Sequence, residues 1–133
     1  MKILLDTSVC VHVLRRNAVM LERLMAWKAR DLAIPAHAAA ELEHGVHLAQ
    51  LRKESRRRVD ELFRRYPVLP FDSAAARRAG LLLFDTGRAG ISMKFFDLMI
   101  AAQAIASGLT LATADGDFEP LAGSRGLKIA KWP

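Results

Sequence analysis

The chain has 133 residues, 52% of them hydrophobic and 26% charged, a composition typical of one globular domain spanning residues 1–133. No apolar run is long enough to cross a bilayer, and the short run after Lys2 cannot form a signal-peptide core, so we expect neither a membrane segment nor a cleaved leader. Twenty Lys and Arg against 14 Asp and Glu give a net charge of +6, which favours polyanions such as nucleic acids without identifying one. The single cysteine, Cys10, cannot form an internal disulfide and favours a cytoplasmic protein.

The N-terminal half alternates short apolar strands with helices. Residues 2–5 predict a buried strand that stops at Asp6, and Ser8 is a suitable N-cap for the helix behind it. The elements expected next are a helix at 18–29, a strand at 32–35, a helix at 38–51 and a basic amphipathic helix at 54–66.

The C-terminal half continues this alternation. A short strand is expected at 68–71, followed by a helix at 73–86 whose first residue, a serine, is its expected N-cap. Asp97 opens the clearest helix of the chain, which Gly108 closes in the position where helices often end on glycine. Strands follow at 109–113 and 127–130. This order, with no internal repeat, predicts a three-layer α/β/α sandwich around a mostly parallel central sheet.

Four acidic residues occupy positions where this fold places its ligands. Asp6 and Asp115 follow strands, Asp97 begins a helix, and Glu41 lies early in another helix, so all four can meet at the carboxyl edge of the sheet. Carboxylates crowded together normally need a divalent cation to stay ionised, and Mg²⁺ or Mn²⁺ bound by oxygen ligands acts on phosphate esters. Capping, turn formation or simple exposure explains each acid taken singly, but none of them explains why Asp6 should end an apolar strand.

Four segments, in chain order, resemble the motifs of PIN domains, and most of all those of the VapC toxins: LLDTSV at 4–9, AELEHG at 40–45, FDLMIAA at 96–102 and ATADGDF at 112–118. The resemblance implies a Mg²⁺- or Mn²⁺-dependent endoribonuclease that cleaves RNA phosphodiester bonds with a metal-activated water. It also implies a small VapB-like antitoxin that blocks the active site, in a homodimer or a toxin–antitoxin hetero-oligomer. A housekeeping PIN nuclease for RNA processing, without an antitoxin, is the alternative.

The resemblance maps the catalytic and metal-binding acids onto the same four residues: Asp6, Glu41, Asp97 and Asp115. Thr7 and Thr113 match hydroxyl positions that support the metal or the substrate, and Asp117 is the alternative to Asp115 as the fourth acid. The chain departs from the family pattern at Ser8 and Phe96, where many members have asparagine. Neither departure removes one of the four acids.

Other features permit simpler interpretations. Arg56, Arg57 and Arg58 belong to a basic helix that is either an RNA contact or a solvated face held by ion pairs. His44 and His47 have the helical spacing of metal ligands, but a di-iron bundle needs that motif twice. A phosphatase using Asp6 as nucleophile, or a phospho-receiver, is disfavoured by Ser8 two residues on and by the position of Asp6 near the N-terminus.

Overall fold

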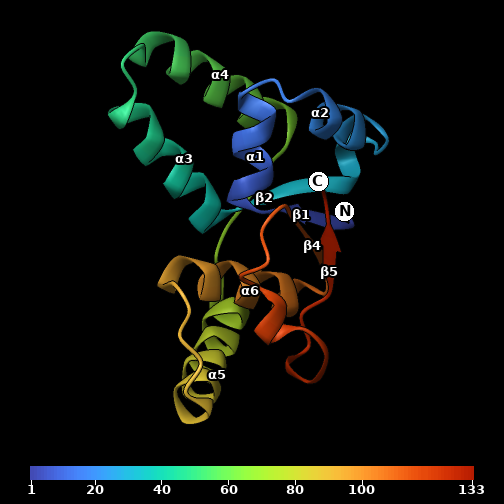
Figure 1. Ribbon diagram of the computed structural model, residues 1–133, viewed down its shortest axis with the longest axis vertical. Helices are drawn as coiled ribbons and strands as arrows, with labels where there is room; N and C mark the ends of the chain where they lie inside the picture. Colours follow the sequence, from blue (N-terminus) through green and yellow to red (C-terminus); the bar gives the residue numbers. More distant parts are fainter.

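A computed structural model describes all residues, 1–133, and its centre is a sheet of five parallel strands in the order β3-β2-β1-β4-β5 (Figure 1). The strands are β1 (Ile3–Leu5), β2 (Leu32–Pro35), β3 (Val68–Leu69), β4 (Thr110–Thr113) and β5 (Ile129–Lys131). Every pairing is parallel, which confirms the predicted fold class and makes the sheet wholly rather than mostly parallel.

Six helices cover the sheet. They are α1 (Thr7–Leu14), α2 (Ala18–Met25), α3 (Ala36–Leu48), α4 (Arg52–Arg65), α5 (Ser73–Ala89) and α6 (Phe95–Ser107). In Figure 1, α1 to α4 lie above the strands, and α5 and α6 lie below them, so the three predicted layers are present. None of these helices is long and apolar enough to cross a membrane.

The core forms where the central strands meet α6. Strands β1 and β2 are buried throughout because helices cover both faces of the sheet. Helix α6 is buried all round from Leu98 to Ala104, since it packs between the sheet and α5. Burial also raises the pKa of the Cys10 thiol, so this cysteine is a small core residue rather than a reactive group.

Two predicted helix caps are wrong. Helix α1 begins at Thr7, with Asp6 in the N-cap position, and the Ser8 hydroxyl donates to Asp6 instead of accepting from the helix backbone. Helix α5 is capped by Asp72, whose carboxylate accepts the amide N–H of Ala75 at 2.9 Å, and not by the serine that follows it.

Several element ends differ from the sequence prediction. The helix expected at 18–29 ends at Met25, where the chain turns into the short 3-10 helix Ala29–Asp31 that leads into β2. Helices α3 and α4 each begin two residues earlier than predicted, and α3 ends three residues earlier, at Leu48. The last strand is shifted to Ile129–Lys131, because its register is set by pairing with β4 and not by its own apolar run.

The order of the strands creates a crevice beside β1. From β1 the chain first adds β2 and β3 on one side, and later adds β4 and β5 on the other side. Open parallel sheets bind ligands at such a change of direction, outside the carboxyl ends of the two strands concerned. In this chain the two strands are β1, followed by Asp6, and β4, followed by the turn that contains Asp115.

Candidate active site

Asp6 follows β1 at the carboxyl edge of the sheet and is held there by two hydroxyl groups. Its side chain is only 3% exposed, and its Oδ2 accepts hydrogen bonds from Ser8 Oγ at 2.8 Å and Thr113 Oγ1 at 2.9 Å. The amide N–H groups of Ala114 and Asp115 donate to these same two hydroxyls at 3.1 Å each, which directs both hydroxyl protons towards the carboxylate. The turn after β4 therefore sets the orientation of the acid that follows β1.

Burial raises the pKa of Asp6 above its ordinary value, because removing a carboxylate from water disfavours its charged form. The hydrogen bonds from Ser8 and Thr113 act in the opposite direction but do not cancel the effect of burial. A nearby positive charge stabilises the ionised form of a buried carboxylate whose pKa is raised in this way.

Glu41 faces the same crevice from α3. Thr7 Oγ1, in the first turn of α1, donates to Glu41 Oε1 at 2.7 Å. This contact links α1 to α3 and limits the positions that the Glu41 carboxylate can take. Thr7 and Thr113 thus occupy matching roles, each orienting one acid from the element next to it.

Asp97 shows most directly that the acids lie close together. It sits in the first turn of α6, and its pKa is raised to about 6. Burial is the largest cause, followed by the negative charges of Asp6, Glu41 and Asp115, whereas Lys94 acts in the opposite direction. The structure therefore brings the four predicted acids within electrostatic reach of one another.

The fourth motif supplies two acids in different settings. Asp115 adds to the repulsion at Asp97, and its Oδ1 accepts the amide N–H of Asp117 at 2.6 Å, so Asp115 itself stabilises the turn. Asp117 is exposed and lines a separate hollow with Asp97 and Lys94. This arrangement favours Asp115 as the fourth acid and leaves Asp117 at the mouth of the site.

The four acids fit a hydrated divalent cation better than a closed cage. All the candidate ligands are carboxylate oxygens, which hard cations prefer, and a cation would relieve the repulsion felt at Asp97. No three His, Cys, Asp or Glu side chains stand close enough together to hold an ion by themselves. Mg²⁺ is commonly held by one or two carboxylates together with several waters, and such an ion is compatible with this spacing.

Comparison with known proteins identifies the family. Residues 3–123 match the sequence profile of the PIN domain. The chain belongs to the PIN domain family. This PIN domain is 26% identical over 126 residues to the tRNA(fMet)-specific endonuclease VapC of Shigella flexneri, covering 94% of this chain and 96% of that protein.

Two further relatives extend the comparison. This PIN domain is 34% identical over 127 residues to the plasmid stability protein StbB of Pseudomonas syringae pv. tomato, covering 88% of this chain and 91% of that protein. The crystal structure of DNA-bound VapBC from Salmonella typhimurium matches with a TM-score of 0.91 and 25% identity, covering 100% of this chain and 99% of that one. The likeness to VapC proteins therefore extends over the whole PIN domain in both sequence and structure.

The basic helix of this PIN domain is held by ion pairs. Arg56 binds Glu43 of α3 through both guanidinium nitrogens and also reaches Asp60 at 3.2 Å. The two neighbouring arginines have partners one turn away, since Arg58 pairs with Glu54 at 2.6 Å and Arg57 lies 4.0 Å from Glu61. The structure thus contains the ion-paired helix face that the sequence allows. His44 and His47 are exposed residues on α3.

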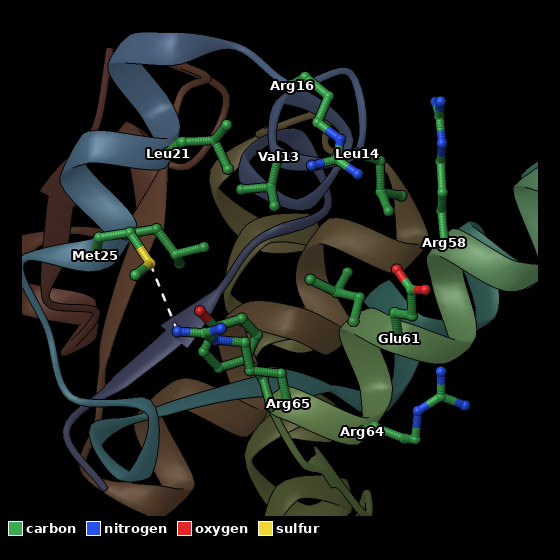
Figure 2. Close-up of a pocket in the computed structure, with 12 residues that line it drawn as sticks. Val13, Leu14, Arg16, Leu21, Met25, Arg58, Glu61, Arg64 and Arg65 are labelled. Atoms are coloured by element: carbon green, nitrogen blue, oxygen red, sulfur yellow. Dashed lines mark hydrogen bonds between the residues drawn. The ribbon is translucent and has the colours of Figure 1, made fainter.

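A groove leads away from the acids along α1. One hollow of about 400 Å³ includes Thr7 and Glu41, and a second of about 490 Å³ lies between α1, α2 and α4. Leu14 and Arg58 line both hollows, so the two lie next to each other along α1. Figure 2 shows the second hollow, which apolar side chains and arginines line together and in which Arg65 reaches across to the Met25 sulfur at 3.5 Å; its labelled residues are Val13, Leu14, Arg16, Leu21, Met25, Arg58, Glu61, Arg64 and Arg65.

Sequence reasoning missed one residue that holds an acid of the site. The sequence predicts a structural role for Ser8 as a helix cap and none in the site, whereas Ser8 donates to Asp6 and accepts from Ala114. No local signal reveals this role, because the partner strand lies more than a hundred residues away in the chain. Its position two residues after Asp6, at the end of a strand, is the only sequence feature that could have suggested it.

Proposed function

We propose that this PIN domain is the ribonuclease toxin of a toxin–antitoxin pair, and that it hydrolyses RNA phosphodiester bonds at Asp6, Glu41, Asp97 and Asp115 with Mg²⁺ or Mn²⁺. The observation that carries the proposal is the raised pKa of Asp97, caused in part by the charges of the other three acids at the change of direction in the sheet. The likeness to a tRNA(fMet)-specific endonuclease VapC supports RNA as the substrate.

Each residue has a distinct part in this proposal. A bound divalent cation would supply Lewis acidity and an activated water. Asp6 and Asp97 would hold the cation most directly. Asp6 is held in place by two hydroxyl groups, and Asp97 is repelled by the negative charges of the other three acids, which a cation would offset. Glu41, oriented by Thr7, would hold the attacking water or accept a proton from it.

Cleavage of total RNA by the purified protein tests the proposal. We expect cleavage that requires Mg²⁺ or Mn²⁺ and stops with a chelator. Asp6→Asn and Asp97→Asn should each reduce the rate by more than the roughly 10–100-fold that losing an outer-shell metal partner costs. Asp85→Asn, a carboxylate on α5 away from the crevice, is the matched control and should cleave normally. Normal cleavage by both site variants at saturating Mg²⁺ would refute the site.

We further propose that the groove along α1 receives a segment of the antitoxin. The groove is lined by apolar side chains that suit the face of a helix and by arginines that suit acidic side chains, and it ends at Glu41. A basic residue at the end of such a segment could pair with the acids and exclude the cation.

This groove is the observation that favours the toxin over a housekeeping nuclease. An RNA-processing enzyme that acts alone has no need for an apolar channel ending at its acids, whereas a toxin must be silenced. The crystallised Salmonella relative is itself a VapBC complex. A homodimer or toxin–antitoxin hetero-oligomer in the cytoplasm remains our prediction for the assembly.

A further inference from the structure

Aromatic rings gather beside the acids at the junction of α3 and α6. His37, in the first turn of α3, packs edge-to-face on Phe96 with ring centroids 5.3 Å apart and an interplanar angle of 89°. The same imidazole contacts Phe71 at 4.8 Å, and Phe95 lies 6.3 Å from Phe96. His37 therefore joins the three phenylalanines into one cluster and fixes the tilt of the Phe96 ring.

Two of these rings are exposed where burial would be expected. Helix α6 is buried all round from Leu98 to Ala104, yet Phe95 and Phe96 at its start are 56% and 38% exposed. Exposed phenylalanine forgoes much of the free energy that burial would provide. Contact with His37 covers one part of the Phe96 ring. The exposed part of the ring has no contact within the chain.

The cluster lies on the side of the site where Glu41 and Asp97 approach. His37 precedes Glu41 by four residues, which puts the two on one face of α3, and Phe96 directly precedes Asp97 in the first turn of α6. Helix α3 starts beside the first turns of α6, as Figure 1 shows. A base next to the phosphate at the acids would therefore come within reach of the Phe96 ring.

We propose that Phe96, braced by His37, stacks on an unpaired nucleobase of the RNA next to the bond that is cut. The inference rests on the proposed function. Single-stranded RNA is commonly recognised by stacking of splayed bases on aromatic side chains, and a phenyl ring offers no hydrogen bond to read the base edge. The contact would thus position the strand and require an unpaired base, with little selection among the four bases.

Fluorescence tests this stacking without any cleavage. The probe is short single-stranded oligouridine carrying one 2-aminopurine, whose fluorescence is quenched by stacking, and the protein is Asp6→Asn, so that the RNA stays intact. We expect quenching at one position of the probe, its loss in Asp6→Asn with Phe96→Leu, and its retention with Phe96→Trp. Phe84→Leu, an exposed aromatic on α5, is the matched control and should leave the signal unchanged. Equal quenching with Phe96→Leu and Phe96→Trp would overturn the inference.

Cleavage kinetics give a second test that separates the inference from the proposed function. With an RNA cut by the wild type, an abasic nucleotide at the stacked position should slow cleavage by at least about fivefold, as should Phe96→Leu. The two changes combined should cost no more than either alone, because both remove the same contact. Additive losses would overturn the stacking role. If the wild type cuts no RNA, the proposed function fails while the fluorescence test still decides the stacking.

Discussion

Asp97 gives the site a dependence on pH that can be measured without RNA. Its pKa is about 6 in the folded protein, against about 3.9 for an unperturbed aspartate. Between these values the folded chain keeps a proton on Asp97 that the unfolded chain has released, so the contribution of Asp97 to the free energy of unfolding falls as pH rises from about 4 to about 6. The repulsion between Asp97 and the other three acids therefore arises when Asp97 loses its proton.

We expect a smaller fall in Asp97→Asn than in the wild type, because Asp6, whose pKa is also raised, is still present in the variant. In the presence of a chelator, the melting temperature of the wild type should drop relative to that of the variant as pH rises through this window. At neutral pH, Mg²⁺ should then raise the melting temperature of the wild type more than that of Asp97→Asn. Thermal unfolding followed by circular dichroism measures both effects. A difference between the two proteins that stays constant across the window would contradict the assigned cause.

Gln103 is a buried polar residue whose role lies in positioning α3. Its Nε2 donates to the carbonyl oxygens of Leu69 at 2.9 Å and Pro70 at 3.1 Å, and its Oε1 accepts the Ala36 amide N–H at 3.2 Å. That amide belongs to the first turn of α3, where N–H groups have no partner within the helix. One side chain therefore ties α6 to the end of β3 and to the start of the helix that carries Glu41.

Gln103→Met should destabilise the fold by about 2–3 kcal/mol. Methionine fills a similar volume, but it leaves one buried N–H and two carbonyl groups with fewer partners, and each unsatisfied group costs about 1–3 kcal/mol. Chemical denaturation measures the change, with the exposed Gln50→Met as control. A loss no larger than that of the control would show that water replaces these hydrogen bonds.

At the scale of elements, Arg56 is the brace between α3 and α4. It binds Glu43 on the neighbouring helix, and this hydrogen-bonded contact holds the pKa of Glu43 below its ordinary value. Arg57, by contrast, has only a 4.0 Å pair within its own helix. The two arginines look equivalent in the sequence, and the structure separates them.

Arg56→Ala should therefore lower the melting temperature more than Arg57→Ala does. Because the pKa of Glu43 is lowered, the contribution of the pair is present above the ordinary glutamate value of about 4.3 and is lost as pH falls below it. The difference between the two variants should shrink at such acidic pH. Thermal unfolding at neutral and acidic pH measures this, and equal melting temperatures at neutral pH would show that the pair is only a surface contact.

Elements with strong local signals could be predicted from the sequence, and contacts between distant segments could not. Periodicity and composition predict the strand before Asp6, the helix that Gly108 closes and the alternation of strands with helices. All three are present in the structure. The end of α3 at Leu48 carries no Gly or Pro signal, so the predicted helix ran on to residue 51. In the site, the four acids follow from motif positions. The hydroxyl of Ser8 and the amide of Gln103 act across the fold, and local patterns carry no information on such contacts.

At the scale of the whole molecule, the proposed antitoxin groove begins beside Glu41 of the candidate site. The groove passes from the acids along α1 to α2, so one bound segment could cover both the chemistry and a large apolar surface. Met25 of α2 lines this groove and is 61% exposed, whereas Val19 of the same helix is 55% exposed but lies outside it. This pair of residues allows the partner surface to be altered without disturbing the core.

The last prediction uses this pair in cells. Induced alone, the wild-type gene should arrest growth, and the Asp6→Asn gene should not. Co-expression of the cognate antitoxin should restore growth in the strain with the wild-type gene. Met25→Glu should stay toxic but escape this rescue, because it replaces an exposed apolar side chain of the groove by a carboxylate that can pair with Arg65, and it should weaken partner binding by about 2 kcal/mol, or roughly 30-fold. Val19→Glu should be toxic and fully rescued. Equal growth of wild type and Asp6→Asn at comparable soluble expression would favour the housekeeping nuclease, and full rescue of Met25→Glu would place the partner on another surface.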